Sequence, residues 1–282
     1  MKKNYNALLI IFPLYLISCS QQQPINSTGK NEDLQTDNTS TVTKNDAVQL
    51  VNEFPNKLEI PKLQPGEYLI EHFAYSLSYN EDHEQANWIA YELTGKETVS
   101  IINRSDKFII DPLVLTGSAT TSDYSKSGYD RGHLAPAGDM GWSELAMTES
   151  FYYSNMSPQV PGFNRGVWKR LEELIRDWAL ENDTLYVVTG PVLNNNLPAI
   201  GENNVSVPAY YYKVVLDNTL PDKKGIGFIL PNASSKIPLH TFTVSIDSVE
   251  SLTGIDFFPL LPDTLESRIE NNIRIESWSW KK

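Results

Sequence analysis

The sequence contains one cysteine, four histidines and fewer basic than acidic side chains. The single cysteine, Cys19, excludes an intramolecular disulfide and a cysteine-based zinc site. The net charge of −12 argues against a surface-wide positive field of the kind that binds nucleic acid nonspecifically, although it leaves room for a local basic cleft. The 282 residues allow one large domain or two small ones, and 40% hydrophobic residues give a core of ordinary size.

The sequence also lacks a long apolar run. The stretch Ala7–Ser18 follows Lys2 and Lys3 and is short for a bilayer span, which needs ~20 apolar residues. Its end, Leu16–Cys19, resembles the lipobox of bacterial lipoproteins, in which the signal is cleaved before a cysteine that becomes lipidated. We therefore expect an exported protein anchored by lipid on Cys19 to a bacterial membrane, periplasmic or at the cell surface. The alternative is an ordinary secretory signal with a chance cysteine.

The sequence divides into three expected segments. Residues 1–18 form the signal peptide, residues 19–60 a flexible polar tether, and residues 61–282 the folded domain. The tether is rich in Gln, Asn, Ser, Thr and Asp, and such a segment buries too little apolar area to offset its ordering entropy. The chain shows no internal repeat.

The folded part combines strand and helix patterns. Alternating or apolar runs predict strands at 71–79, 87–93, 184–193, 209–217 and 225–231. The strongest helix pattern spans 163–182, and its buried stripe comprises Val167, Trp168, Leu171, Leu174, Ile175 and Trp178. Two shorter helices are expected at 245–258, with Ser245 or Asp247 as the cap, and at 261–273. Residues 116–140 are rich in Gly, Ser and Asp and are expected to form loops.

One short segment, Asp130–His133, brings an imidazole close to a guanidinium. The pKa of a histidine lies near neutrality, so His133 can accept a proton from water. Arg131 supplies a positive fork that suits phosphate oxygens, and Gly132 is expected to let the backbone turn sharply. The combination favours phosphoryl chemistry, although a histidine in a loop is more often structural than catalytic.

The helix at 163–182 carries a second group of polar residues. Asn164 offers a neutral oxygen at its start, and Mg²⁺ prefers hard oxygen ligands while keeping several waters. Glu172 follows two turns later on the polar side, where it could hold a water on the ion. The structural alternatives are that Asn164 caps the helix and that Glu172 pairs with Lys169 or Arg176.

Further polar and aromatic residues are interpreted as structural. Arg131 could clasp Asp130 or Asp139, and Asp130 itself is expected to orient its loop, because a carboxylate is unfavourable beside a polyanion. Core packing is preferred over a base-stacking platform for Tyr210–Tyr212. Structural roles are also expected for the remaining histidines and two late tryptophans: His72, His83, His240, Trp278 and Trp280.

Several of these motifs together resemble those of the DNA/RNA non-specific endonucleases, which are ββα-metal nucleases. The matching strings are DRGHLAPAGDM, SNMSPQ, FN nine residues after Asn155, and then W and LE; ANWIAYEL, VVTGP and VPAYYYKVV are also similar. The resemblance covers roughly Glu71 to Pro262. It implies an α+β fold of the ββα-metal type, with a central antiparallel sheet, flanking helices and long loops.

The resemblance also implies roles for individual residues. His133 matches the general base, and Asn164 matches the single direct protein ligand of Mg²⁺. Glu172 matches the glutamate that orients water on the ion. The implied reaction is hydrolysis of DNA and RNA to 5′-phosphate and 3′-hydroxyl ends, and Mn²⁺ suits the same oxygen ligands.

Three further residues complete the expected site. Arg131 matches an arginine that supports the phosphate, Asn155 a residue that shapes the site, and Arg104 an upstream arginine that contacts phosphate. A catalytically idle relative that binds nucleic acid or a partner, and a phosphodiesterase of small nucleotides, stay open as alternatives. The sequence decides neither DNA against RNA, nor single against double strands, nor the oligomeric state.

Overall fold

The computed structural model describes residues 57–280. The expected signal peptide, Cys19 and most of the expected tether lie outside the described residues. The expected tether boundary at residue 60 is too late, because Leu58 is buried in an apolar core of the folded domain and Ile60 packs against that core. Among residues 57–280, no helix combines the length and apolar character that a membrane span requires.

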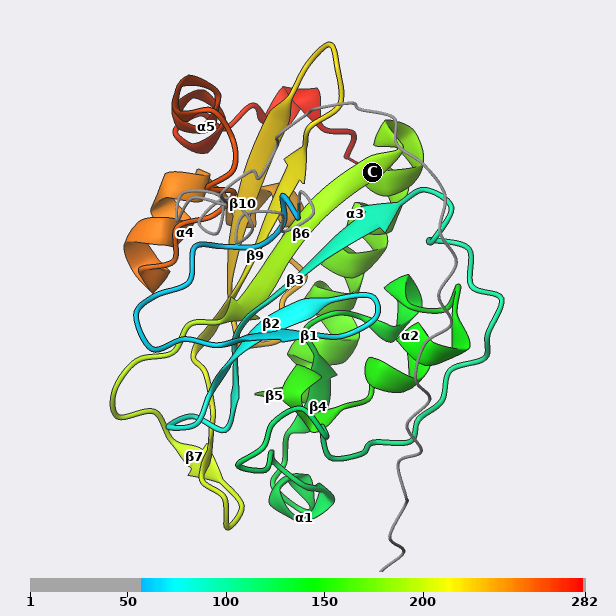
Figure 1. Cartoon of the computed structure of the whole chain (residues 1–282), viewed down its shortest axis with the longest axis vertical. Coiled ribbons are helices and arrows are strands. Elements are labelled where there is room, and N and C mark those ends of the chain that lie inside the picture. The colour runs from blue at the N-terminus through cyan, green and yellow to red at the C-terminus, as the bar shows by residue number, and fades with distance from the viewer. Residues whose placement is uncertain (1–56, 281–282) are drawn as a thin grey trace, which may run out of the picture. The chain divides into compact units, whose positions relative to one another are not determined.

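A seven-stranded sheet forms the centre of the described domain (Figure 1). Its neighbouring strands are all antiparallel. In spatial order they are β1 (Leu69–Glu71), β2 (Ser76–Asn80), β3 (Gln85–Thr94), β6 (Thr184–Pro191), β9 (Tyr210–Asp217), β10 (Lys224–Pro231) and β11 (Thr243–Val244). The strands predicted at 87–93, 184–193, 209–217 and 225–231 are therefore confirmed, as is the α+β class.

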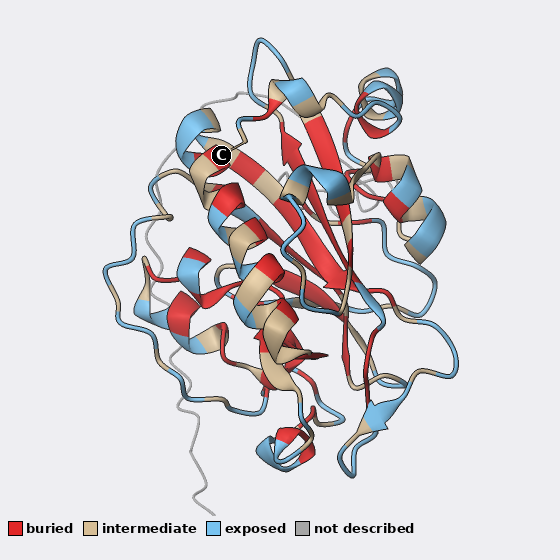
Figure 2. Ribbon diagram, turned by 180° about the vertical axis from the view of Figure 1, so that it is seen from behind, coloured by how far each residue is buried: buried red, intermediate tan, exposed pale blue. Residues whose placement is uncertain are grey.

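Each face of the sheet carries its own apolar core because successive strand residues point to opposite faces. Val187 and Tyr211 join the core under helix α3 (Lys169–Asn182), whereas Val188 and Tyr212 join the core with α4 (Ile246–Thr253) and α5 (Asp263–Glu270). Figure 2 shows the sheet strands largely buried, with α3 lying across them. Complete burial of a large apolar side chain contributes roughly 1.5–3 kcal/mol, so these two cores dominate the stability of the domain.

Glycines of β10 allow α4 and α5 to pack closely on the sheet. A Cβ at Gly225 would lie 2.6 Å from Ile269 and 2.7 Å from Ile246. A Cβ at Gly227 would lie 2.8 Å from Val249. Both contacts are too short for a real side chain, so these positions fix how near the two helices approach.

The long helix and the two short ones form at the predicted places, but α4 ends at Thr253, five residues before its predicted end, and the long helix begins with a local distortion. Residues Phe163–Trp168 form a π-helix that continues directly into α3. Helix α4 begins at the predicted cap, where the Ser245 side chain accepts from the Ser248 amide, and it ends at Gly254 in the left-handed conformation. The C-terminal tail packs on α3, with the Trp278 ring 4.4 Å from the Trp178 ring.

Two predicted segments differ from the structure. The single strand expected at 71–79 is a hairpin, because the His72 amide donates to the Tyr75 carbonyl at 2.8 Å and makes a turn. His72 Nε2 also lies 2.9 Å from the Asp111 carboxylate, and both side chains are buried. This polar pair draws the segment out of the sheet and gives His72 the structural role that was expected.

The second difference concerns residues 116–140, which contain regular structure rather than loops alone. They hold α1 (Thr121–Tyr124), β4 (Asp130–His133) and a 3₁₀ turn at Ala137–Asp139. Strand β4 pairs with β5 (Met156–Gln159) in a separate two-stranded sheet. The remaining elements are α2 (Glu144–Glu149), β7 (Ala199–Ile200), β8 (Val205–Ser206) and 3₁₀ turns at Tyr153–Asn155, Leu239–Phe242 and Ile275–Ser277.

Candidate functional site

The central histidine of the site lies at the end of strand β4, rather than on a loop as predicted. Within the strand, Gly132 faces Ser157 and His133 faces Met156 of β5. A Cβ at Gly132 would overlap the side chain of Gln159, which is completely buried. The expectation of a sharp turn at Gly132 is thus wrong, because the glycine instead leaves space for a side chain of the paired strand.

His133 is buried against aromatic rings. Its ring meets Phe151 edge-on at 4.8 Å and lies 5.9 Å from Phe108. Nε2 is fully buried without a hydrogen-bond partner among residues 57–280, which leaves Nδ1 as the ring nitrogen able to meet water in the cleft. Burial, together with the positive charges of Arg104 and Arg131, lowers the pKa of His133 to about 3. The imidazole is therefore neutral at physiological pH.

Asn155 holds the backbone that follows His133. Its Nδ2 donates to the carbonyls of Ala135, at 2.9 Å, and Ser150, at 2.7 Å. Its Oδ1 accepts from the Ala135 amide at 2.8 Å, and its own carbonyl accepts from the Leu134 amide. The side chain is completely buried and fully bonded. Asn155 therefore positions the histidine without facing the cleft.

The two predicted arginines, Arg104 and Arg131, lie against the same two aromatic rings that contact His133. The Arg131 guanidinium lies over the Phe108 ring at 4.0 Å, and that of Arg104 lies 4.9 Å from the Phe151 ring centre. Arg104 also bonds to Asp106, which is an exposed pair. Arg131 forms no ion pair with any described carboxylate, so the alternative of a clasp to Asp130 or Asp139 is wrong.

Asp130 organises the amide expected to bind metal. Its carboxylate accepts two bonds from Arg165, at 2.6 and 2.8 Å, and one from Asn164 Nδ2 at 2.9 Å. Burial raises the pKa of Asp130, but the bonds from Arg165 and Asn164 outweigh it and hold the pKa below its usual range. Since Nδ2 is fixed on Asp130, Oδ1 of Asn164 stays available as a ligand. Asn164 makes no capping bond, so the helix-cap alternative is wrong.

Glu172 lies in the first turn of α3, beside the buried side chain of Lys213, which belongs to none of the motifs. Burial raises the pKa of Glu172 to about 7, opposed chiefly by the positive charge of Lys213. Lys213 has no exposed surface; its Nζ lies 4.7 Å from the Trp168 ring centre and 3.4 Å from the Leu134 carbonyl. The intrahelical pair involves Lys169 and Glu173 instead of Glu172.

These side chains border one open cleft of about 450 Å³. It contains His133, the amide of Asn164, a single carboxylate, that of Glu172, and five cationic side chains: Arg104, Arg131, Arg165, Lys169 and Arg176. Arg176 is held by Asp139 at 2.6 Å. The structure therefore gathers every predicted catalytic and metal-binding residue except Asn155 at one cleft, and the cationic lining of this cleft suits a polyanion.

Lys213 and Arg176 were missed as site residues for different reasons. The helix pattern offers Arg176 only as a partner of Glu172, and it does not reveal which residues of other elements face Arg176. Lys213 interrupts the apolar strand Tyr210–Asp217, and a lysine in such a run is itself a signal. The cleft is thus more cationic than the motifs alone indicated.

Comparison with known proteins agrees with this geometry. Residues 56–264 match the DNA/RNA non-specific endonuclease family. The chain is 40% identical over 212 residues to Nuclease C1 of Cunninghamella echinulata var. echinulata, covering 68% of this chain and 83% of that protein. It is 34% identical over 241 residues to a nuclease of Nostoc sp., covering 80% and 87%.

A solved structure shows the same fold. The crystal structure of the EndoG/EndoGI complex contains a chain that is 32% identical, with a TM-score of 0.68, covering 73% of this chain and 90% of that one. This agreement confirms the ββα-metal nuclease fold expected from the motifs. From its sequence, fold and relatives, the chain belongs to the DNA/RNA non-specific endonuclease family and is a hydrolase of nucleic acids.

Proposed function

We propose that the protein is a Mg²⁺-dependent endonuclease that cuts DNA and RNA with little sequence preference, with His133 as general base. One observation supports this most directly: a neutral histidine, an oriented amide oxygen and five cationic side chains share one cleft. Cationic side chains recognise phosphates, which carry no sequence information. DNA and RNA are therefore the proposed substrates.

The residues around the cleft fit a divalent cation with oxygen ligands. Asn164 would hold Mg²⁺ through Oδ1, because its Nδ2 is fixed on Asp130. Burial raises the pKa of Glu172, and a positive ion beside the carboxylate would stabilise its ionised form. Bound there, Mg²⁺ would stabilise the extra negative charge of the phosphorane-like transition state, and Mn²⁺ would serve similarly.

His133 supplies the base. Burial is the main cause of the low pKa of His133, and the charges of Arg104 and Arg131 lower it further; a substrate phosphate would offset those two charges and move the pKa upward. Nδ1 then takes a proton from a water as the water oxygen bonds to phosphorus. The bond from phosphorus to the 3′ oxygen breaks, and that oxygen acquires a proton from solvent. The products carry a 5′ phosphate and a 3′ hydroxyl.

The remaining residues position these groups. Asn155 fixes the backbone beyond His133, and Asp130 orients Asn164. Arg131 lies on the Phe108 ring with its guanidinium free of carboxylates among the described residues, which suits it to a phosphate. General-base catalysis contributes ~10²- to 10⁴-fold in rate, and the cation and the arginines must supply the rest.

Plasmid and RNA degradation with Mg²⁺ or EDTA tests this proposal. We expect His133→Ala to lower the rate by ~10²- to 10⁴-fold, and EDTA to abolish cutting. His240→Ala is the matched control, since that ring packs on Trp280 and does not line the cleft. Full activity of His133→Ala would refute the base. A wild type that cuts neither polymer in Mg²⁺ would indicate an idle relative or a phosphodiesterase of small nucleotides.

We also propose that residues 1–18 are a lipoprotein signal, that Cys19 is lipidated, and that residues 19–56 tether the nuclease domain at a bacterial membrane. The support is the Leu16–Cys19 pattern after a short apolar stretch. Several acyl chains on one cysteine give stable anchoring, whereas one chain does not. Cys19→Ser should move the protein from the membrane fraction to the soluble fraction. An unchanged membrane fraction would contradict the anchor.

A further inference from the structure

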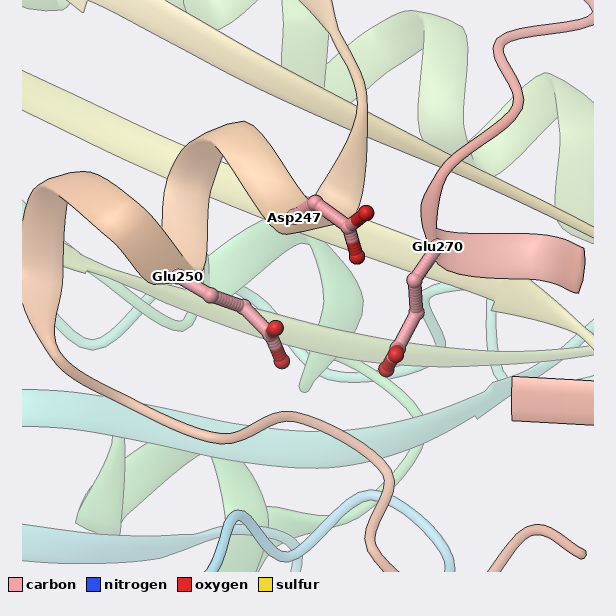
Figure 3. Close-up of side chains that lie close together, drawn as sticks. All are labelled: Asp247, Glu250 and Glu270. Carbon is pink, nitrogen blue, oxygen red and sulfur yellow. The ribbon is translucent and has the colours of Figure 1, made fainter. Parts of the chain in front are cut away.

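Three carboxylates converge where helices α4 and α5 meet (Figure 3). Asp247 lies in the first turn of α4, Glu250 follows one turn later, and Glu270 is the last residue of α5. One oxygen from each side chain lies within 4.8 Å of the others. The two helices thus place three carboxyl groups around one small space.

Glu270 lacks the bonds that a buried carboxylate requires. Its residue is 7% exposed, and Oε1 is fully buried without a hydrogen-bond partner among the described residues. Glu250 differs, since its Oε1 accepts from the Phe257 amide at 2.8 Å. In Figure 3 the Glu270 side chain extends from α5 into the space that it shares with Glu250 and Asp247 of α4. A buried unpaired carboxylate is costly unless a proton or a cation neutralises it.

The surroundings add further negative charge. Burial, and then the charges of Glu250, Glu266, Asp247 and Asp256, raise the pKa of Glu270 to about 8. The nearby ammonium of Lys62 bonds to Asp256 at 3.1 Å and is largely exposed. Glu270 also ends its helix, where the macrodipole disfavours an anion.

We propose that Asp247, Glu250 and Glu270 bind one Ca²⁺ ion that joins α4 to α5. Ca²⁺ takes six to eight oxygen ligands, binds carboxylates through one or two oxygens, and tolerates irregular geometry. Mg²⁺ requires a near-ideal octahedron, which three side chains from two helices do not readily provide. Such an ion would neutralise Glu270 and fasten both helices over the apolar core that contains Ile246 and Ile269.

The role is structural and separate from catalysis. Because α4 and α5 cover the opposite side of the sheet from α3, the ion would not share ligands with Asn164 or Glu172. Ca²⁺ binding would therefore raise the thermal stability of the protein even when the cleft is disabled.

Thermal unfolding of the Asn164→Ala protein, which lacks the proposed cleft ligand, tests this site. We expect a change from EDTA to Ca²⁺ at about 100 times its Kd to raise Tm by roughly 5–10 °C. Equilibrium dialysis should show one Ca²⁺ per chain. Glu270→Gln and, separately, Asp247→Asn should each weaken Ca²⁺ binding at least ~10-fold; Asp247 is not buried, so its variant keeps the fold testable.

Glu266→Gln is the matched control, because it removes the same charge one turn earlier on α5 without touching the three ligands. It should keep both the bound ion and the Tm shift. Absence of Ca²⁺ binding in the unsubstituted cluster, or equal losses in Glu266→Gln and Glu270→Gln, would overturn the proposal. The proposal would also be wrong if, in EDTA, Glu270→Gln had a higher Tm than the protein with Glu270 and if Ca²⁺ did not change the Tm of either protein. Glu270 would then be a protonated acid that binds no ion.

Discussion

The two sides of the central sheet surround an acidic side chain with opposite charges: Glu172 is half-buried on the α3 side, and Glu270 is buried on the α4–α5 side. On the α3 side, burial raises the pKa of Glu172 to about 7, and the charges of Lys213 and Arg176 oppose that rise. On the α4–α5 side, burial raises the pKa of Glu270 to about 8, and the neighbouring charges are carboxylates that raise it further. The first environment has compensating cations within the protein, whereas the charges that act on Glu270 among residues 57–280 are all carboxylates.

This difference shows how little the net charge says about a site. The chain carries −12 overall, yet its cleft is lined by five cationic side chains and one carboxylate. Acidic residues gather instead around α4 and α5, where they do not repel a substrate in the cleft. The negative net charge therefore excludes a surface-wide basic field, but it does not exclude local recognition of phosphate.

The largest expected effect comes from removing the internal cation of the α3 side. Lys213→Met removes the main compensating charge beside the half-buried Glu172, and we expect the free energy of unfolding to fall by about 1–3 kcal/mol. Nuclease activity should fall as well, because Nζ also reaches the Leu134 carbonyl beside His133. Urea unfolding and plasmid cutting measure the two effects.

The double variant Lys213→Met/Glu172→Gln separates charge compensation from packing. Since the unpaired charge is then gone, it should recover most of the lost stability while staying inactive. A double variant less stable than Lys213→Met would contradict the compensation and assign Lys213 a packing role against Trp168.

A smaller effect is expected where a carboxylate orients a ligand. Asp130→Ala frees the Asn164 amide, so the Mg²⁺ concentration at half-maximal activity should rise about 10-fold. Arg165→Ala removes the neighbouring ion pair but keeps the bond from Asn164 to Asp130, and its Mg²⁺ requirement should match the wild type. Equal requirements in both variants would show that this amide bond does not prepare the metal site.

The effect that is smallest at neutral pH concerns the proton on His133. Imidazole NMR should show this ring neutral down to about pH 4 in the metal-free protein, because its pKa is lowered to about 3. The unfolded chain binds that proton near pH 6.5, so this residue lowers folded-state stability as pH falls from 6.5 toward 3 and has no such effect above 6.5.

Arg131→Met should move the pKa of His133 upward, since Arg131 is one of the charges that lower it. Arg165→Met serves as the control, because Arg165 lines the same cleft but pairs with Asp130. A His133 ring that titrates near 6.5 in the wild type would contradict the burial seen here.

The sequence predicted most elements of the fold and most residues of the cleft, but for different reasons. Strong periodicity predicted the long helix and four strands, because each pattern lies within one continuous segment. The motif residues His133, Arg131, Asn164 and Glu172 were found because short spacings identify them. Asn155 was found too, although the structure places it behind the histidine rather than in the cleft.

Features that depend on a distant partner could not be predicted. The role of Lys213 depends on the packing of β9 under α3, which brings its side chain beside Trp168. The turn at His72 depends on Asp111, almost forty residues later. The π-helix at Phe163–Trp168 is invisible to a pattern with an α-helical period, since it interrupts that period at the turn that carries Asn164.

Gly132 carries a consequence for protein engineering. Because its missing side chain makes room for Gln159, the four-residue string Asp130–His133 has its shape only beside its partner strand. A designer who transplants the string alone would leave the histidine without its support. The smallest portable unit is the β4–β5 strand pair with the whole segment that connects the two strands, including Asn155, which bonds to Ala135.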